Sequence, residues 1–262
     1  MIKHLIFRQL LWCTFTIALL IFSLGISWQV SKSNNFFYGF WYQSLQINSV
    51  ISKNVRINTQ GKRDFPINDV QLHEEKFADI VRAIHQQGDG LAEISYLNQH
   101  GSSQKLLTKS EVVHLQDVAN LLNSLTIVWW GNLFFLLGLL IFYCRQASNI
   151  IISQGMPKAQ VSSLSIMPNA KQKLIALSIF ALLVIAILSV WGFTQVFYYL
   201  HTVVFPVEHQ WFFYYRDSLM ASIMKAPDIF AAIAAQLMLV ALLLTTAIEA
   251  IVCRYQCKSG TI

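Results

Sequence analysis

The sequence predicts an all-α membrane protein with four transmembrane helices, cytoplasmic N- and C-termini, and two exterior segments. The first exterior segment is expected to fold as a small α+β domain, and the second as an interfacial loop. Composition is one reason, because 55% of the 262 residues are hydrophobic and 12% are charged, whereas soluble domains carry about 25% charged residues. The others are four long apolar stretches and basic residues that gather on one side.

Four stretches are apolar and long enough to cross a bilayer core, which takes about 20 helical residues. The first has a basic flank like that of a signal peptide. Bulky residues follow it, among them Trp28, Phe36 and Phe37, and no small-residue cleavage site is convincing, so we interpret it as an uncleaved anchor. The predicted spans are residues 10–30, 121–144, 174–200 and 229–252.

Basic residues orient these spans. They occur at the N-terminus, in the loop 145–173, which has no acidic residue, and in the tail 253–262. These three segments are therefore expected to be cytoplasmic. Most of the net charge of +6 comes from the basic residues of these expected cytoplasmic segments, so nucleic acid is not an expected partner. The basic residues concerned are Lys3, Arg8, Arg145, Lys158, Lys171, Lys173, Arg254 and Lys258.

The first exterior segment, residues 31–120, is long enough to fold. Apolar residues on odd positions predict a strand over 45–57, helical spacing predicts a helix over 74–87, and 91–97 resembles a second strand. Neither exterior segment contains a cysteine. A disulfide framework and an outward-facing thiol oxidoreductase are thereby excluded.

The second exterior segment, residues 201–228, is short and lightly charged. Five consecutive aromatic residues run from Trp211 to Tyr215. Aromatic side chains favour the headgroup level of a bilayer. This segment is therefore expected to lie in the membrane interface or to dip into it.

One short motif precedes the second span. Glu111, His114 and Asp117 recur every three residues, so on a helix they share one face. Helix-start charges around a surface histidine would explain this spacing without any function. However, His201 follows the third span directly, so it should lie at the same depth as His114 on the adjacent antiparallel helix. His209 is a weaker third candidate because its neighbours are polar.

Two converging histidines leave three interpretations open. They could be a general acid/base pair, metal or haem ligands, or unrelated interface residues. A mixed metal site would combine both histidines with Glu111 or Asp117, although no HxxxH or HExxH spacing supports it. No span contains the paired histidines of a haem relay. Ser110 and Ser218 do not lie in a recognisable nucleophile turn.

Two motifs resemble those of the bacterial lipoprotein intramolecular transacylases. Residues 111–118 are similar to that family's ExxHMxDV signature, with Leu115 in place of methionine. The family's second signature begins with Phe-His, and here Leu200 replaces the phenylalanine. The residues of this chain that match the second signature are His201, Phe205, Trp211, Asp217 and Pro227.

The resemblance implies that the chain moves the sn-2 acyl chain of a diacylglyceryl lipoprotein onto the α-amine of its N-terminal cysteine. The product is an N-acyl lyso-lipoprotein, and no cofactor, metal or acyl-enzyme is expected. The family's two essential histidines map onto His114 and His201. We take His114 as the base and His201 as the group that serves the oxyanion or leaving oxygen, although these roles could be exchanged. Supporting roles are expected for Glu111, Asp117, Trp211, Arg216 and Asp217. Either Glu111 or Asp117 is expected to fix the tautomer of His114.

The implied location is the bacterial cytoplasmic membrane, with membrane lipid around the spans and the site at the extracytoplasmic face. Two other functions remain open. A membrane-anchored sensor or adaptor would act through its exterior domain and would not need the histidines. A histidine-based metal-handling protein, for example for copper, would bind metal when purified.

Overall fold

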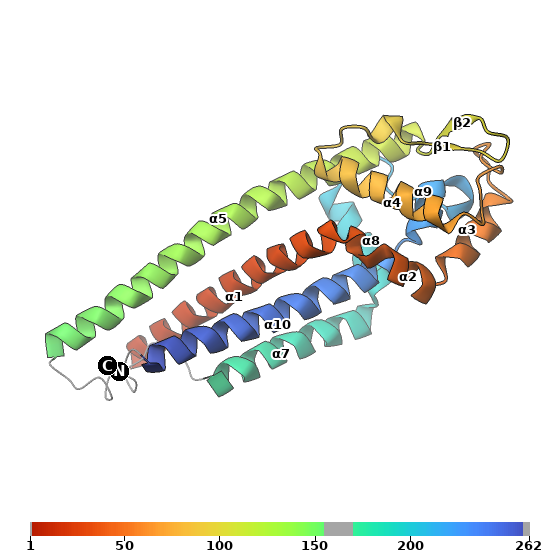
Figure 1. Ribbon diagram of the computed structural model, residues 1–262. Coiled ribbons are helices and arrows are strands. Elements are labelled where there is room, and N and C mark those ends of the chain that lie inside the picture. Colours follow the sequence, from red (N-terminus) through yellow and green to blue (C-terminus); the bar gives the residue numbers. More distant parts are fainter. Residues whose placement is uncertain (1, 155–169, 259–262) are drawn as a thin grey trace. The chain divides into compact units, whose positions relative to one another are not determined.

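The computed structural model describes residues 2–154 and 170–258 (Figure 1). The chain forms two compact units. We call Met1–Gln29, Ile127–Ile187 and Leu237–Ile262 the helix unit, and Val30–Thr126 and Leu188–Gln236 the site unit. The long helices are α1 (Ile2–Ser33), α5 (Lys109–Gln154), α7 (Ala170–Trp191) and α10 (Asp228–Lys258).

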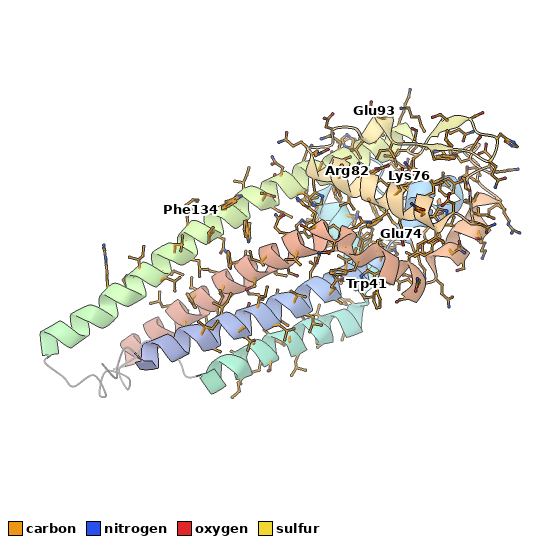
Figure 2. The ribbon with its side chains drawn as sticks, viewed as in Figure 1. Trp41, Glu74, Lys76, Arg82, Glu93 and Phe134 are labelled. Atoms are coloured by element: carbon orange, nitrogen blue, oxygen red, sulfur yellow. The ribbon has the colours of Figure 1, made fainter. Side chains whose placement is uncertain are left out.

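Three of the long helices are long and apolar enough to cross a membrane. Their candidate spans are Leu10–Ser33 in α1, Lys109–Phe142 in α5 and Asp228–Ile251 in α10, and α7 contains a shorter apolar stretch, Ile175–Val184. Phe134 on α5 is 70% exposed and points outward from the helix, as expected for a lipid-facing side chain (Figure 2). The expected loop 145–173 and tail 253–262 lie partly outside the described residues.

The expected third span, residues 174–200, is not one continuous helix. α7 ends at Trp191, and α8 (Phe193–Val204) begins after Gly192. Gly192 has a φ of 78°, which residues with a side chain rarely adopt but glycine adopts easily. This residue separates α7 from α8. His201 therefore lies on a separate helix of 12 residues rather than at the end of a span.

Polar contacts join the helices of the helix unit. From α5, the Trp129 indole donates to the Phe22 carbonyl over 3.1 Å. From α1, the Thr16 hydroxyl donates to Glu249 of α10 over 3.1 Å. Thr245 of α10 donates to Ser23 over 3.0 Å. Small and polar residues on facing helices are typical of helix packing in membranes.

Most of the regular secondary structure of the site unit is helical, and the strand expected over residues 45–57 is wrong. The segment contains α3 (Ile47–Val55), preceded by α2 (Tyr38–Ser44). Ile47, Ile51 and Val55 are all buried. They are four residues apart, so the same odd positions that satisfy a strand also form one stripe of a helix.

The expected helix over 74–87 is confirmed as α4 (Val70–His85), whose Asp69 caps it by accepting from the Leu72 amide over 2.9 Å. Lys76 and Arg82 lie on α4 (Figure 2). The expected strand over 91–97 is correct only in its second half. A short 3₁₀ turn, η2 (Leu91–Glu93), precedes β1 (Ser95–Leu97), which pairs antiparallel with β2 (Ser103–Lys105).

The second exterior segment contributes to the core of the site unit, which its aromatic composition did not predict. It contains the 3₁₀ turn η4 (Tyr215–Asp217) and α9 (Leu219–Met224), and every residue of α9 is buried. The Tyr38 hydroxyl of α2 donates to the Ile223 carbonyl over 2.8 Å. The Lys225 ammonium donates to the Leu45 carbonyl over 2.8 Å. Only the part of the segment before η4 keeps the exposed aromatic side chains expected at an interface, with Phe212 and Tyr214 exposed.

Candidate functional site

The two histidines singled out by their positions meet in the site unit. His114 lies in the second turn of α5 and His201 lies near the end of α8, and their ring centroids are 6.0 Å apart. His114 is buried, at 7% exposed. The predicted convergence of these two imidazoles is therefore present, although a short separate helix supplies one of them.

Local geometry determines the tautomer of neutral His201. Its Nδ1 lies 2.7 Å from the carbonyl oxygen of Phe197, one helical turn earlier. A carbonyl only accepts, so Nδ1 carries the proton and Nε2 keeps its lone pair. Burial lowers the pKa of His201 below 6.5, although the bond to Phe197 acts in the opposite direction. Near neutral pH, His201 is thus a neutral imidazole that presents an acceptor nitrogen.

His114 differs because its Nδ1 is buried and has no hydrogen-bond partner among the residues that the structure describes. A buried polar atom without a partner is rare in folded proteins and calls for an explanation. One explanation is that Nδ1 forms its hydrogen bond with a substrate group, which is present only when the substrate is bound.

Aromatic rings hold both imidazoles. The His114 ring contacts Phe205 at 5.0 Å and Phe213 at 6.0 Å between centroids. The His201 ring contacts Phe197 at 4.1 Å, Phe205 at 5.1 Å and Trp211 at 5.1 Å. Phe205 therefore touches both histidines. The surroundings are largely apolar, which strengthens any hydrogen bond or charge interaction made there.

Neither neighbouring acid is hydrogen-bonded to His114 within the described part of the chain, contrary to the expectation that one of them fixes its tautomer. Glu111 is fully buried and accepts hydrogen bonds from the Thr108 amide, over 2.5 Å, and from the Ser218 hydroxyl. Ser218 also caps α9 by accepting from the Ala221 amide over 2.8 Å. Glu111 therefore joins the start of α5 to the start of α9.

Asp117 has a different partner, the third histidine. Asp117 Oδ2 lies 2.6 Å from His209 Nδ1. An ionised carboxylate can only accept, so the imidazole nitrogen is the donor. The sequence marks His209 only weakly, because its neighbours Glu208 and Gln210 suggest an ordinary exposed loop.

The remaining expected residues have clear positions. Trp211 packs on His201, as described above. Asp217 accepts from the Thr59 hydroxyl over 2.6 Å, and the Thr59 amide donates to the Arg216 carbonyl over 3.1 Å, so both residues fasten η4 to the segment after α3. The Arg216 side chain is exposed, and its guanidinium carbon lies 5.7 Å from the Tyr214 ring centroid. Phe197, Phe213 and Thr108 were missed, because ring packing and backbone donors leave no spacing signal.

The mixed metal site that the sequence left open as an alternative is not assembled among the described residues. Both acids that would complete it are bound to other side chains, and the described residues contain no group of three or more His, Cys, Asp or Glu side chains suited to a metal ion. What the arrangement offers is proton chemistry. One imidazole presents a lone pair, and a second imidazole 6.0 Å away has an unused nitrogen.

Residues 13–227 match the family described as "Lipoprotein intramolecular transacylase Lit". No curated protein matches the chain. Among solved structures, the chain is similar to the membrane integral lipoprotein intramolecular transacylase Lit from Bacillus cereus, in a form with a histidine-to-arginine substitution. The likeness covers 97% of this chain and 94% of that one, with a TM-score of 0.61 and 12% identity. At this identity it is evidence for the fold.

Proposed function

Because the chain belongs to the lipoprotein intramolecular transacylase family, we propose that it moves the sn-2 acyl chain of a diacylglyceryl lipoprotein onto the α-amine of that lipoprotein's N-terminal cysteine. The family assignment makes the chain an enzyme that acts on lipoproteins, and its apolar helices make it a membrane protein. The observation that carries the finer proposal is the pair of close, differently bonded imidazoles, His114 and His201.

The reaction needs proton transfer at two atoms. The α-ammonium has a pKa of about 7.7–8.0 and attacks only as the free amine. Its nitrogen bonds to the ester carbonyl carbon, the bond to the sn-2 glyceryl oxygen breaks, and the proton that leaves nitrogen balances the one gained by that oxygen. Nucleophile and ester belong to one molecule, so an enzyme that positions them needs no acyl-enzyme.

The hydrogen bonds support one distribution of roles. His201 Nδ1 donates to the Phe197 carbonyl, so its Nε2 is an acceptor suited to take the amine proton. The resulting imidazolium can return a proton to the leaving glyceryl oxygen. His114 then serves the oxyanion through an N–H bond, which an amide side chain could also supply. This is the exchanged form of the assignment expected from the sequence, in which His114 was the base.

The membrane arrangement belongs to the same proposal. Four spans with cytoplasmic termini place the histidine pair at the extracytoplasmic face of the bacterial cytoplasmic membrane, where lipoprotein ester groups lie. The apolar outer ends of the spans would accommodate the acyl chains, and surrounding lipid would complete the solvation. The exposed Arg216 side chain would contact a phosphate headgroup.

The test uses a bacterium that lacks its own amine acylation and expresses this chain. The N-terminal lipopeptide of a lipoprotein is analysed by tandem mass spectrometry. Transfer leaves the total mass unchanged, so the decisive ions are fragments that carry N-acyl cysteine. We expect these ions with the wild type. Their absence, with both chains still on glycerol, would contradict the proposal.

Two isosteric variants separate the histidine roles. Asparagine keeps a neutral N–H donor near the Nδ1 position but has no basic nitrogen. We expect His201→Asn to abolish transfer and His114→Asn to retain a measurable part of it. If the ranking is reversed, His114 is the base. If His114→Ala and His201→Ala both remain active, the histidine mechanism is wrong even where the wild type transfers the chain.

A further inference from the structure

The pairing of Asp117 with His209 in the site unit has no role in the reaction described above. The two residues are separated by 92 positions in the sequence, and Oδ2 lies 2.6 Å from Nδ1. The Asp117 side chain is 16% exposed and that of His209 is 39% exposed. This pair is therefore more exposed than His114, and Asp117 lies one helical turn after His114 on α5.

His209 belongs to the segment whose rings surround those imidazoles. Phe205, Trp211 and Phe213 lie on either side of it in the sequence, and each contacts His114, His201 or both. We call residues 205–213 the aromatic segment. Its position therefore decides how both catalytic rings are packed.

Short-range bonds do not by themselves place the aromatic segment over α5. The Phe205 amide donates to the His201 carbonyl, which continues α8, and the His209 amide donates to the Pro206 carbonyl within the segment. The His209 side chain, by contrast, reaches α5. It binds there one helical turn after His114, on the same face of α5.

We propose that His209 is a positioning residue for the transfer reaction. Its Nδ1–H bond to Asp117 fastens the middle of the aromatic segment to α5, so that Phe205, Trp211 and Phe213 hold the two catalytic imidazoles in a productive arrangement. This inference rests on the proposed function. It adds a third histidine, which acts through the others and does not touch the reacting atoms.

The expected effect is on catalysis more than on stability. A partly exposed bond between two polar side chains contributes little to folding stability. A small displacement of catalytic groups, however, can slow an enzyme by about 100-fold. We expect His209→Ala to lower kcat about 10- to 100-fold, with a smaller change in KM, because the segment orders the catalytic rings rather than binding the lipoprotein.

The experiment measures kcat and KM for transfer on a synthetic diacylglyceryl lipopeptide by the purified full chain in lipid nanodiscs. His209→Asn places an amide N–H where Nδ1 stands, and Asp117→Asn keeps an acceptor oxygen. Both should retain most of the activity. The double variant Asp117→Ala/His209→Ala should be no slower than either single alanine variant, because both remove the same bond. His100→Ala, an exposed histidine of the same unit, is the matched control and should match the wild type.

The outcomes separate this inference from the proposed function. A wild-type chain without transfer activity overturns the proposed function. An active wild type with an unchanged kcat in His209→Ala overturns only the positioning role. The positioning role is equally overturned if His209→Asn is as slow as His209→Ala, or if the two alanine effects multiply. If His209→Ala does not fold, the two asparagine variants still decide.

Discussion

His201 owes its orientation to its own helix. The bond from Nδ1 to the Phe197 carbonyl spans one turn of α8, and the Phe197 ring lies 4.1 Å from the imidazole. Many catalytic histidines are oriented by a carboxylate, and the sequence pattern Glu-x-x-His-x-x-Asp suggested that arrangement for His114. Here a carbonyl does the orienting, and it does so for the other histidine. The acids flanking His114 stabilise the surrounding structure instead.

The pH profile of the reaction follows from this environment. Burial lowers the pKa of His201 below 6.5, so this imidazole stays neutral where a free histidine begins to gain a proton. The substrate ammonium, with a pKa of about 7.7–8.0, is then the first group to limit the rate as the pH falls. We expect log(kcat/KM) to fall with unit slope below about pH 7.5 and to steepen only below about pH 6.5. Initial rates between pH 5.5 and 9 test this, and a steepening that begins above pH 6.5 would contradict it.

Close helix packing in the helix unit depends on one glycine. A Cβ placed on Gly25 of α1 would lie 1.9 Å from Trp129 Nε1, the atom that donates to the Phe22 carbonyl. The indole also stacks on Phe22, with centroids 5.8 Å apart and planes 6° apart. The ring thus occupies the space that a larger residue would need.

We therefore expect Gly25→Ala to destabilise the protein by about 1–3 kcal/mol through overpacking. The apparent melting temperature in detergent is the measurement. Gly138→Ala on α5 is the matched control, since its added Cβ would meet no atom within 4 Å. That control should be neutral or slightly stabilising, because alanine favours the helix. Equal melting temperatures for the two variants would mean that α1 and α5 are not closely packed at Gly25.

A buried carboxylate joins α5 to α9. Glu111 is fully buried and receives hydrogen bonds from the Thr108 amide and the Ser218 hydroxyl. Nearby, the Lys62 ammonium donates to the Leu106 carbonyl over 2.6 Å, and burial lowers the pKa of Lys62 while the charge of Glu111 opposes that shift. The start of α5, which carries His114, is thereby held in a polar network inside the site unit.

Removing one donor from this network should be costly. We expect Ser218→Ala to lower the free energy of unfolding by about 1–3 kcal/mol, because the buried carboxylate loses a partner that water cannot replace. Denaturant titration of the detergent-solubilised chain measures this. The exposed Ser102 offers the control Ser102→Ala, which should change little. A Ser218→Ala variant as stable as that control would show that the hydroxyl is dispensable.

At the scale of the whole molecule, contacts within the site unit constrain the topology. Asp117 near the start of α5 binds His209 after α8, and Thr59 binds Asp217. These contacts agree with the proposed topology, in which residues 31–120 and 201–228 lie on the same side of the membrane. If α5 crosses the bilayer, the proposed topology requires the chain to cross back before His209, and α7, with its shorter apolar stretch Ile175–Val184, is the long helix described between them.

Cysteine labelling in intact cells tests that topology. In a chain whose four native cysteines are replaced by serine, Ser102→Cys and Thr202→Cys should react with a membrane-impermeant maleimide. Arg145→Cys should react only after the cells are permeabilised. All three positions are exposed. Labelling of position 202 only after permeabilisation would rule out α7 as a span.

The sequence predicts the parts of this molecule that depend on composition and local spacing. Apolar runs identify α1, α5 and α10, and the topology that follows brings His114 and His201 together. Local spacing predicts the wrong element where a strand and a helix both fit it, as at Ile47, Ile51 and Val55. It also misses a break where one glycine interrupts an apolar run, as at Gly192. It also cannot pair Glu111 with Ser218 or Asp117 with His209, which are 107 and 92 residues apart.

The bond between Glu111 and Ser218 also bears on biogenesis. Ser218 is synthesised 107 residues after Glu111, so the hydrogen bond between them can form only after the segment that contains α7 and α8 has been made. Until then, the carboxylate lacks the Ser218 hydroxyl, one of its two hydrogen-bond donors. The start of α5, which carries His114, therefore gains its full set of hydrogen bonds only late in synthesis.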